Sequence, residues 1–367
     1  MQIPLRLQLL VRTEVPTGVL LAAAYAAVVF MATPLLLPAI ADEYDLSLGA
    51  TSFVATAQLG GFVLGSWGAG RFLDPRRRVF TTSLVIVLVA NAVSVFLPTY
   101  SVLISLRVVS GLALGIIVWF SWVLAFGDSQ RTSEVAVVGP LIGVVSAPII
   151  GLVVGEFGPG GSFALFAALA VIPLVFGRTT HMQVQPPQRT GRNRPTRSAL
   201  VMLLALLALT LGGSAVFSFS AIIAGDLQMS PLVLSLAYSA NALAGVPSAR
   251  AKLQSPRPWL WLILVGTMAT LLTVNSSSLR FDAIVMLWVF AYWRAVPPAF
   301  TLLAERSNFP EQRAGDAQAI MAVGRVIGPL IAGLLLDQGD PWVLGVVAST
   351  VIGSAAVAVW VVQHRPA

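Results

Sequence analysis

Long apolar stretches alternate with short polar ones along the whole chain, and this pattern predicts its architecture. We count twelve apolar stretches, most of them close to the length of about 20 residues that crosses a hydrocarbon core about 30 Å thick. They cover roughly residues 15–40, 48–71, 79–98, 101–126, 134–155, 161–178, 198–224, 230–248, 258–275, 282–304, 314–336 and 342–362. Because these stretches are continuous, they favour transmembrane helices over the alternating strands of a β-barrel. We therefore predict an all-α polytopic membrane protein with twelve transmembrane helices.

One polar segment divides the twelve stretches into two equal groups. The segment from His181 to Ser198 is rich in Arg, Gln and Pro and has no apolar periodicity, as expected for a linker. We predict an N-terminal six-helix bundle over residues 1–178, a cytoplasmic linker over 179–197, and a C-terminal six-helix bundle over 198–367. Two matched halves joined in this way are typical of secondary transporters.

An internal repeat supports the division into pseudo-symmetric halves. The fifth and eleventh stretches both contain a Gly, three further residues, Gly or Ala followed by Pro, and then more Gly. The residues are Gly143, Pro148 and Gly151 in the first copy and Gly324, Gly328 and Pro329 in the second, which also contains Arg325. Small residues at such intervals let helices approach closely in lipid, so we expect helix packing to be their immediate role.

The charged residues predict the orientation of the spans. Only 10% of the 367 residues are charged, whereas soluble proteins carry about 25%. With both termini in the cytoplasm, 18 of the 22 basic residues lie on the cytoplasmic side, Arg280 alone lies outside, and three lie within spans. This asymmetry follows the positive-inside rule and explains the net charge of +7 without a nucleic-acid partner. We expect a monomer in a bacterial inner membrane.

Several classes of chemistry are excluded by residues that the chain lacks. It has no cysteine, and its two histidines, His181 and His364, lie in polar segments. Its only lysine is Lys252, in Ala251-Lys252-Leu253, so no phosphate-binding Gly-x4-Gly-Lys-Ser/Thr loop can be formed. We therefore expect no enzyme, no metal site, no cofactor and no ATP-driven transport by this chain alone.

Three stretches resemble signature motifs of the major facilitator superfamily, and the resemblance covers essentially the whole chain. In the loop after the second span, Gly70, Asp74 and Arg78 match the signature, whereas Pro75 and Arg77 depart from it. In the fourth span, Leu106 to Gly115, with Arg107 and Gly111, resembles the motif with an embedded arginine. Gly143 to Gly151 resembles the fifth-span motif of antiporter-type exporters, with Ala147 in place of a glycine. The resemblance implies an efflux transporter that works by alternating access.

Asp74 is the candidate for a cytoplasmic gate, together with Arg77 and Arg78. A carboxylate is favoured at a helix N-terminus, and the resemblance suggests the start of the eleventh span, near Gly315, as its partner in the outward-facing state. The alternative is that Asp74 only offsets the repulsion among its neighbouring arginines.

Arg107, Arg294 and Arg325 are the sharpest signals, because each lies well inside an apolar span. A charge at mid-bilayer costs from about 2.5 to more than about 10 kcal/mol by different estimates, and such residues usually face a cavity. None of the 15 carboxylates falls clearly within a span. These cations are satisfied either by neutral groups of the protein or by an anionic substrate. The first alternative is strong for Arg107 and Arg325.

We expect Arg294 and Arg107 to contact the substrate, with Tyr25, Tyr292, Trp293 and Asn241. The aromatic residues could instead be membrane anchors. The sequence thus predicts an exporter of a small organic molecule, a drug or a metabolite and in particular an anion, with a proton as the candidate coupling ion. Proton carriers within the membrane are usually Asp, Glu or His. Because none of these residues falls clearly within a span, the sequence weakens the case for proton antiport. The alternatives are an importer or anion exchanger, and a transporter-like sensor that moves nothing.

Overall fold

A computed structural model describes residues 14–125, 129–177, 193–225, 227–248 and 257–364, and these residues are almost entirely helical. Most of the predicted linker, residues 179–192, lies outside the described residues. The first half contains α2 (Thr17–Met31), α3 (Thr33–Tyr44), α4 (Leu48–Phe72), α5 (Arg77–Ser94), α6 (Tyr100–Ala125) and α7 (Ser129–Gly177). The second half contains α8 (Arg197–Ser218), α9 (Ser220–Gly225), α10 (Pro231–Ser248), α11 (Pro258–Thr273), α12 (Ser278–Glu305), α13 (Pro310–Gln338) and α14 (Pro341–His364).

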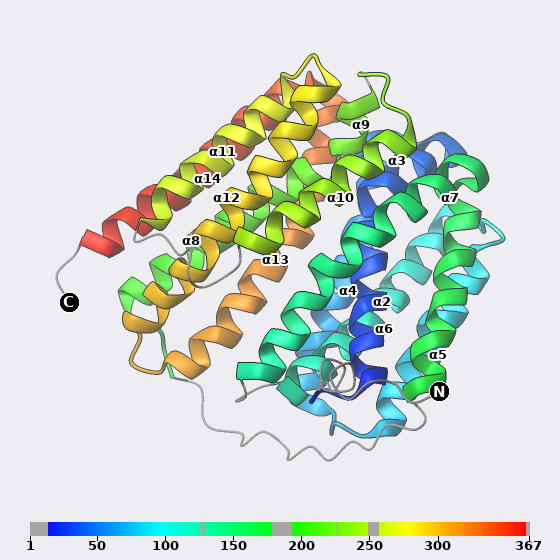
Figure 1. Ribbon diagram of the computed structural model, residues 1–367, viewed down its shortest axis with the longest axis horizontal. Coiled ribbons are helices and arrows are strands. Elements are labelled where there is room, and N and C mark those ends of the chain that lie inside the picture. Colours follow the sequence, from blue (N-terminus) through cyan, green and yellow to red (C-terminus); the bar gives the residue numbers. More distant parts are fainter. Residues whose placement is uncertain (1–13, 126–128, 178–192, 226, 249–256, 365–367) are drawn as a thin grey trace, which may run out of the picture.

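These elements correspond to the twelve predicted spans. Helix α7 supplies the fifth and sixth spans, because Gly158 has non-helical backbone angles (φ 60°, ψ −159°) and divides it into two limbs, which diverge from a bend near the top of Figure 1. Helices α2 and α3 form the first span, bent by 50° at the break between them. Helices α8 and α9 follow each other closely and form the seventh. The twelve-helix prediction is confirmed.

The two halves pack by the same rule, which confirms the expected pseudo-symmetry. In the first half α2 packs on α7, α4 on α6 and α5 on α7. The equivalent pairs in the second half are α8 with α13, α10 with α12 and α11 with α14. The halves meet along two seams, α4 against α13 and α7 against α10, which are also related by the repeat.

Glycines permit the closest of these packings. A Cβ atom placed on Gly111 of α6 would overlap the carbonyl oxygen of Gln58 on α4. In the second half, a Cβ atom on Gly324 would lie 2.8 Å from the carbonyl oxygen of Leu207 on α8, and one on Gly328 would lie 2.5 Å from that of Leu211. Backbones in direct contact gain dispersion energy that lipid cannot replace, so Gly111, Gly324 and Gly328 serve packing within each half.

The helix ends define two faces of the molecule. The linker face carries the ends at Phe72, Arg77, Arg197 and Glu305, and it runs along the lower part of Figure 1. The far face carries the ends at Tyr44, Leu48, Gln338 and Pro341, near the top of Figure 1.

Candidate functional site

A cavity of about 450 Å³ lies between the two halves. Its walls come from α2, α3 and α4 in the first half and from α8, α10, α12 and α13 in the second. The lining is mostly apolar and aromatic and includes Phe30, Phe62, Phe217 and Trp288. A cavity of this size, mainly apolar with few polar groups, is the usual form of a binding site for a small organic molecule.

Arg325 is the one charged residue among the described residues that line this cavity. It lies near the middle of α13, and its side chain is exposed to the cavity. It makes no hydrogen bond or ion pair with any residue that the structure describes. No carboxylate is present in the described lining to balance it. The cavity therefore presents an unpaired guanidinium group to whatever enters.

The α12 helix contributes aromatic side chains to the same cavity. Trp288, Tyr292 and Trp293 line the cavity, and the rings of Tyr292 and Trp293 meet edge to face with their centroids 5.8 Å apart. Asn241 of α10 also lines it, and its side-chain amide donates to the carbonyl oxygen of Val285 at 2.6 Å. The structure thus brings together three of the predicted substrate contacts, Tyr292, Trp293 and Asn241.

Arg294, the first of the predicted substrate contacts, does not join them in the described cavity lining. Its guanidinium carbon lies 5.2 Å from the ring centroid of Trp261 on α11, and it is absent from the cavity lining. Successive helix residues are rotated by about 100°. The face of α12 that carries Tyr292 and Trp293 toward the cavity therefore turns Arg294 toward α11. The cavity cation is Arg325, for which the sequence favoured a structural role.

Arg107 and Tyr25 also lie outside the central cavity. Arg107 is 1% exposed and donates to Asn91 Oδ1 at 3.0 Å, to Ser94 Oγ at 2.7 Å and to Gln58 Oε1 at 3.4 Å. The Asn91 amide donates in turn to the Tyr25 hydroxyl at 2.9 Å. These residues form a buried polar cluster inside the first half and are not among the described residues that line the central cavity.

The halves are closed at the far face, where α13 meets α4. Asp337, near the end of α13, accepts hydrogen bonds at one oxygen from the Ser47 hydroxyl at 2.8 Å and the Gly49 backbone N–H at 2.9 Å. Ser47 is the N-cap of α4, so the carboxylate lies at the positive end of that helix. Nearby, a Cβ atom on Gly333 would lie 2.6 Å from the carbonyl oxygen of Leu48.

The second seam, α7 against α10, is closed by the repeat predicted in the fifth span. A Cβ atom on Gly143 would lie 3.3 Å from the Ala242 side chain, and one on Gly151 would lie 2.7 Å from the carbonyl oxygen of Pro231. The Ser239 hydroxyl donates to the carbonyl oxygen of Val144 at 2.8 Å. Pro148 lies inside this stretch of α7, and Pro329 is buried at the matching place in α13.

The linker face shows no such closure among the described residues. Asp74 forms an ion pair with Arg76 at 2.9 Å, rather than with Arg77 or Arg78, which line a surface groove with Thr81 and Leu174. A Cβ atom on Gly315 would have no atom within 4 Å. The latch predicted between Asp74 and the start of α13 is thus not formed in this state. Gly70 packs instead toward Trp119 of its own half, with a built Cβ atom 3.4 Å from the indole nitrogen.

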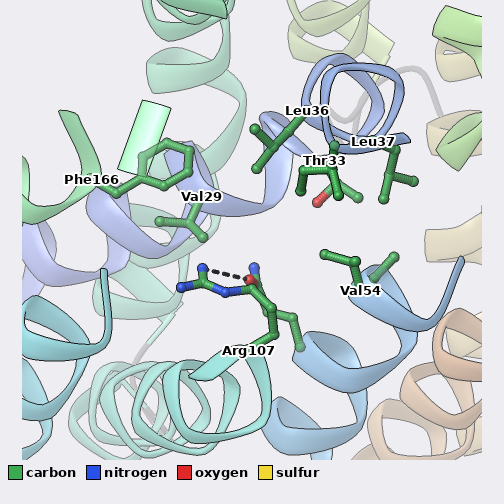
Figure 2. Close-up of a pocket in the computed structure, with 10 residues that line it drawn as sticks. Val29, Thr33, Leu36, Leu37, Val54, Arg107 and Phe166 are labelled. Carbon is green, nitrogen blue, oxygen red and sulfur yellow. Dashed lines mark hydrogen bonds between the residues drawn. The ribbon is translucent and has the colours of Figure 1, made fainter. Parts of the chain in front are cut away.

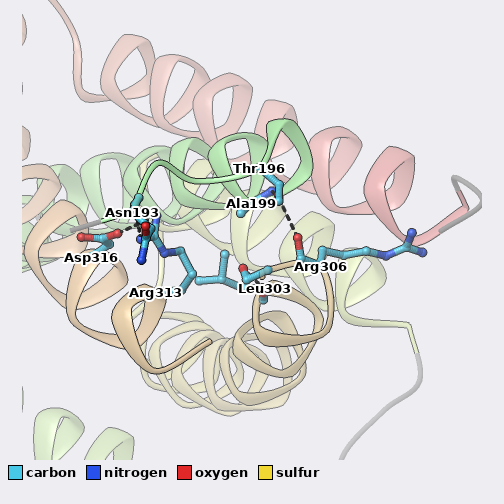
Figure 3. A network of polar contacts seen from close by, with 8 residues as sticks. Asn193, Thr196, Ala199, Leu303, Arg306, Arg313 and Asp316 are labelled. Carbon is cyan, nitrogen blue, oxygen red and sulfur yellow. Dashed lines mark hydrogen bonds and ion pairs between the residues drawn. The ribbon is translucent and has the colours of Figure 1, made fainter. Parts of the chain in front are cut away.

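The start of the second half is fixed by a separate polar network on the linker face, shown in Figure 3. Arg313 is 2% exposed, donates to the carbonyl oxygen of Asn193 at 2.8 Å and pairs with Asp316 at 3.0 Å. Thr196 caps α8 by accepting from the Ala199 N–H at 3.1 Å and donates to the carbonyl oxygen of Arg306 at 2.7 Å. The first turn of α8 is therefore tied to α12 and α13.

Solved structures share this arrangement at low sequence identity. The human organic anion transporter MFSD10 (TETRAN) is 15% identical with a TM-score of 0.68, and the match covers 98% of this chain and 100% of that one. The nucleoside transporter NupG is 9% identical with a TM-score of 0.73, covering 96% and 100%. An auto-inhibited peptide transporter of the POT family is 12% identical with a TM-score of 0.71, covering 95% and 98%.

At these identities the likeness establishes the fold, while the sequence itself establishes the family. Residues 19–325 match the profile of the Major Facilitator Superfamily. The match spans most of the chain, from the start of the first half to Arg325 near the middle of α13, and includes every described residue that lines the central cavity. The chain is therefore a multi-pass membrane transporter that belongs to the Major Facilitator Superfamily.

Proposed function

We propose that the protein is a secondary transporter that exports a small organic anion with an apolar or aromatic portion. The observation that carries this proposal is Arg325, an unpaired cation in a cavity whose other described lining residues are uncharged. A guanidinium group binds carboxylate or phosphate through two parallel hydrogen bonds. An organic cation would find no counter-charge in the described lining and would be repelled by Arg325.

The rest of the wall supports the apolar portion of such a substrate. Trp288, Tyr292 and Trp293 offer ring faces and edges, and Phe30 and Phe62 face them from the first half. Burying apolar surface contributes about 25 cal/mol per Å². Aromatic pairs add about 0.5–1.5 kcal/mol in favourable geometry. A planar anion would therefore place its acid group on Arg325 and its ring among these side chains.

Transport would proceed by rocking of the two halves around this cavity. The closed far face and the open linker face correspond to an inward-facing state, with the termini and the linker in the cytoplasm of a bacterial cell. In the opposite state, Asp74 would reach the start of α13 and latch the linker face. Export is favoured over import by the resemblance of Gly143 to Gly151 to the motif of antiporter-type exporters.

Anion exchange is a second candidate mode, because no carboxylate is found in the described lining to carry a proton. The likeness to a human organic anion transporter is in keeping with an anionic substrate. A proton coupled through an acid outside the cavity is the competing mechanism.

Flux measurements in vesicles of defined orientation test the proposal. Purified protein would be reconstituted in one orientation, and radiolabelled organic anions would be supplied at the linker face. We expect movement toward the far face, and we expect it to be lost in Arg325→Gln. Net flux only in the opposite direction would make the protein an importer. A requirement for a counter-anion on the far side would show exchange, and a requirement for a proton gradient would show antiport. Absence of flux, with no alternation between the two states, would indicate a sensor.

A further inference from the structure

A second, much smaller pocket lies inside the first half, apart from the central cavity. It has a volume of about 20 Å³ and is enclosed by the break between α2 and α3, by α4, by α6 and by α7. Arg107 lies on one side and Thr33 on the other, with Leu36, Val54 and Phe166 closing the remaining walls, as Figure 2 shows. Neither the superfamily match nor the proposed transport of an organic anion accounts for this pocket.

Arg107 reaches this pocket with its charge unbalanced. Its guanidinium group is 1% exposed. Every hydrogen-bond partner that the structure gives it is neutral: the amide oxygens of Gln58 and Asn91 and the hydroxyl of Ser94. The Phe163 ring lies 4.6 Å from its central carbon. Its Nε–H has no hydrogen-bond partner in the described part of the chain. A buried charge without a counter-charge is strongly unfavourable, so the site is electrostatically incomplete.

The opposite wall of the pocket offers a further hydrogen-bond donor, the hydroxyl of Thr33. Helix α3 begins at Thr33, after the 50° bend that separates it from α2. The Thr33 hydroxyl makes no hydrogen bond to another described residue and faces the same gap as Arg107 in Figure 2. One unbalanced guanidinium group and two side chains with unused donors, Arg107 and Thr33, therefore line one small space.

The size of the pocket limits its ligand. A space of about 10–15 Å³ measured in this way holds one water molecule, so about 20 Å³ admits a single ion or one to two waters. A carboxylic acid with a carbon chain would not fit. Thr33 lines the central cavity as well as this pocket, which provides a route by which a small ion can enter from the central cavity.

We propose that this pocket binds a monatomic inorganic anion of the size of chloride, held between Arg107 and Thr33. The ion would supply the negative charge that the polar cluster of Tyr25, Asn91 and Arg107 lacks. The proposal concerns a site separate from Arg325, and it stands whether or not the central cavity carries an organic anion.

Chloride and bromide titrations of the full-length protein in lipid nanodiscs test this site. The melting temperature would be measured while sodium gluconate is replaced by sodium chloride or bromide at constant ionic strength. We expect a saturable rise in the melting temperature for both halides. In Thr33→Val, which keeps all charges, the dissociation constant should rise about tenfold, as expected when a hydrogen bond to a charged group is lost. In Arg107→Gln the saturable response should disappear.

Two controls make the result decisive. Thr267→Val removes a threonine hydroxyl that bonds only to its own helix and should leave the halide response unchanged. Arg325→Gln should also leave it unchanged, which separates this site from the organic-anion site. If Arg107→Gln does not fold, the comparison of Thr33→Val with Thr267→Val decides. No saturable halide effect in the wild type, equal responses in the two threonine variants, or loss of the response in Arg325→Gln would each overturn the proposal.

Discussion

Replacing Asp337 with asparagine should shift the transporter toward a state that is open at the far face. Asp337 is the charged group that joins α13 to the N-terminus of α4 across the seam between the halves. Its contacts with Ser47 and Gly49 exist only while that face is closed. A group that stabilises one of two states shifts the equilibrium by its differential interaction energy, so the size of the shift follows from these contacts.

The magnitude can be worked from the two hydrogen bonds. Both end on the same carboxylate oxygen, at 2.8 Å from the Ser47 hydroxyl and 2.9 Å from the Gly49 N–H. Hydrogen bonds to charged groups contribute about 1.5–3 kcal/mol, but Asp337 is exposed, so the lower end applies. Asparagine keeps a carbonyl acceptor and loses the charge that favours the helix end. We expect a loss of about 1–2 kcal/mol, which changes the equilibrium between the two states by a factor of about 5–30.

Electron–electron distance measurements on spin labels would detect this shift. The chain has no cysteine, so a label pair at Thr99→Cys and Leu279→Cys can be introduced on the far face without removing native residues. The pair joins the start of the α6 region to the start of α12, one label in each half. We expect Asp337→Asn to increase the population at the longer distance.

Asp340→Asn is the matched control, because Asp340 lies on the same face and its side chain makes no contact across the seam in the described chain. The reasoning would be refuted if Asp337→Asn and Asp340→Asn gave the same distance distribution as the unsubstituted pair. At about 1 M salt, the range of interactions between exposed charges falls to about 3 Å. The reasoning would also be refuted if the increase in distance caused by Asp337→Asn were no larger at low salt than at about 1 M salt.

Three further substitutions test the packing and the placement of the arginines. Gly333→Val should also favour the open far face, because its Cβ atom would lie 2.6 Å from the Leu48 carbonyl oxygen; the same label pair reads this out. Gly111→Val should prevent stable folding, since its side chain would overlap the backbone of Gln58; size-exclusion profiles and melting curves show the loss. Arg294→Gln should leave ligand affinity within about twofold, as expected for a residue outside the cavity; ligand titrations followed by the melting temperature check this.

The sequence predicts the spans well because hydropathy alone decides which segments enter a membrane. All twelve stretches are found as helical spans. The matched glycines serve close packing in both copies, against α10 across the seam in the fifth span and against α8 of the same half in the eleventh. What hydropathy does not contain is rotation about the helix axis. Arg294 and Tyr292 are two residues apart, yet one faces α11 and the other faces the cavity.

The roles of three residues depended on contacts between distant segments. The sequence favours satisfaction of Arg325 by neutral groups, and only the packing of α13 shows that it lines the cavity. Tyr25 was expected at the substrate, but the path of α2 brings it to Asn91 and the Arg107 cluster. Asp337 reads as one of several outer-loop acids until α4 is seen to begin beside it. The available signal for this contact was Ser47, an N-cap residue type that marks the start of a helix. The positive end of a helix favours a nearby carboxylate.

The most direct test of the central claim is a thermal-shift panel of organic anions, neutral compounds and organic cations on the purified protein, with Arg325→Gln and Arg294→Gln beside the wild type. A ligand at about 100 times its dissociation constant stabilises the folded state by about 2.7 kcal/mol, a shift that is easily measured. We predict that aromatic anions stabilise the wild type and Arg294→Gln, and that Arg325→Gln weakens them at least tenfold. Stabilisation by cations or neutral compounds alone, unchanged in Arg325→Gln, would contradict the assignment of the cavity to an organic anion.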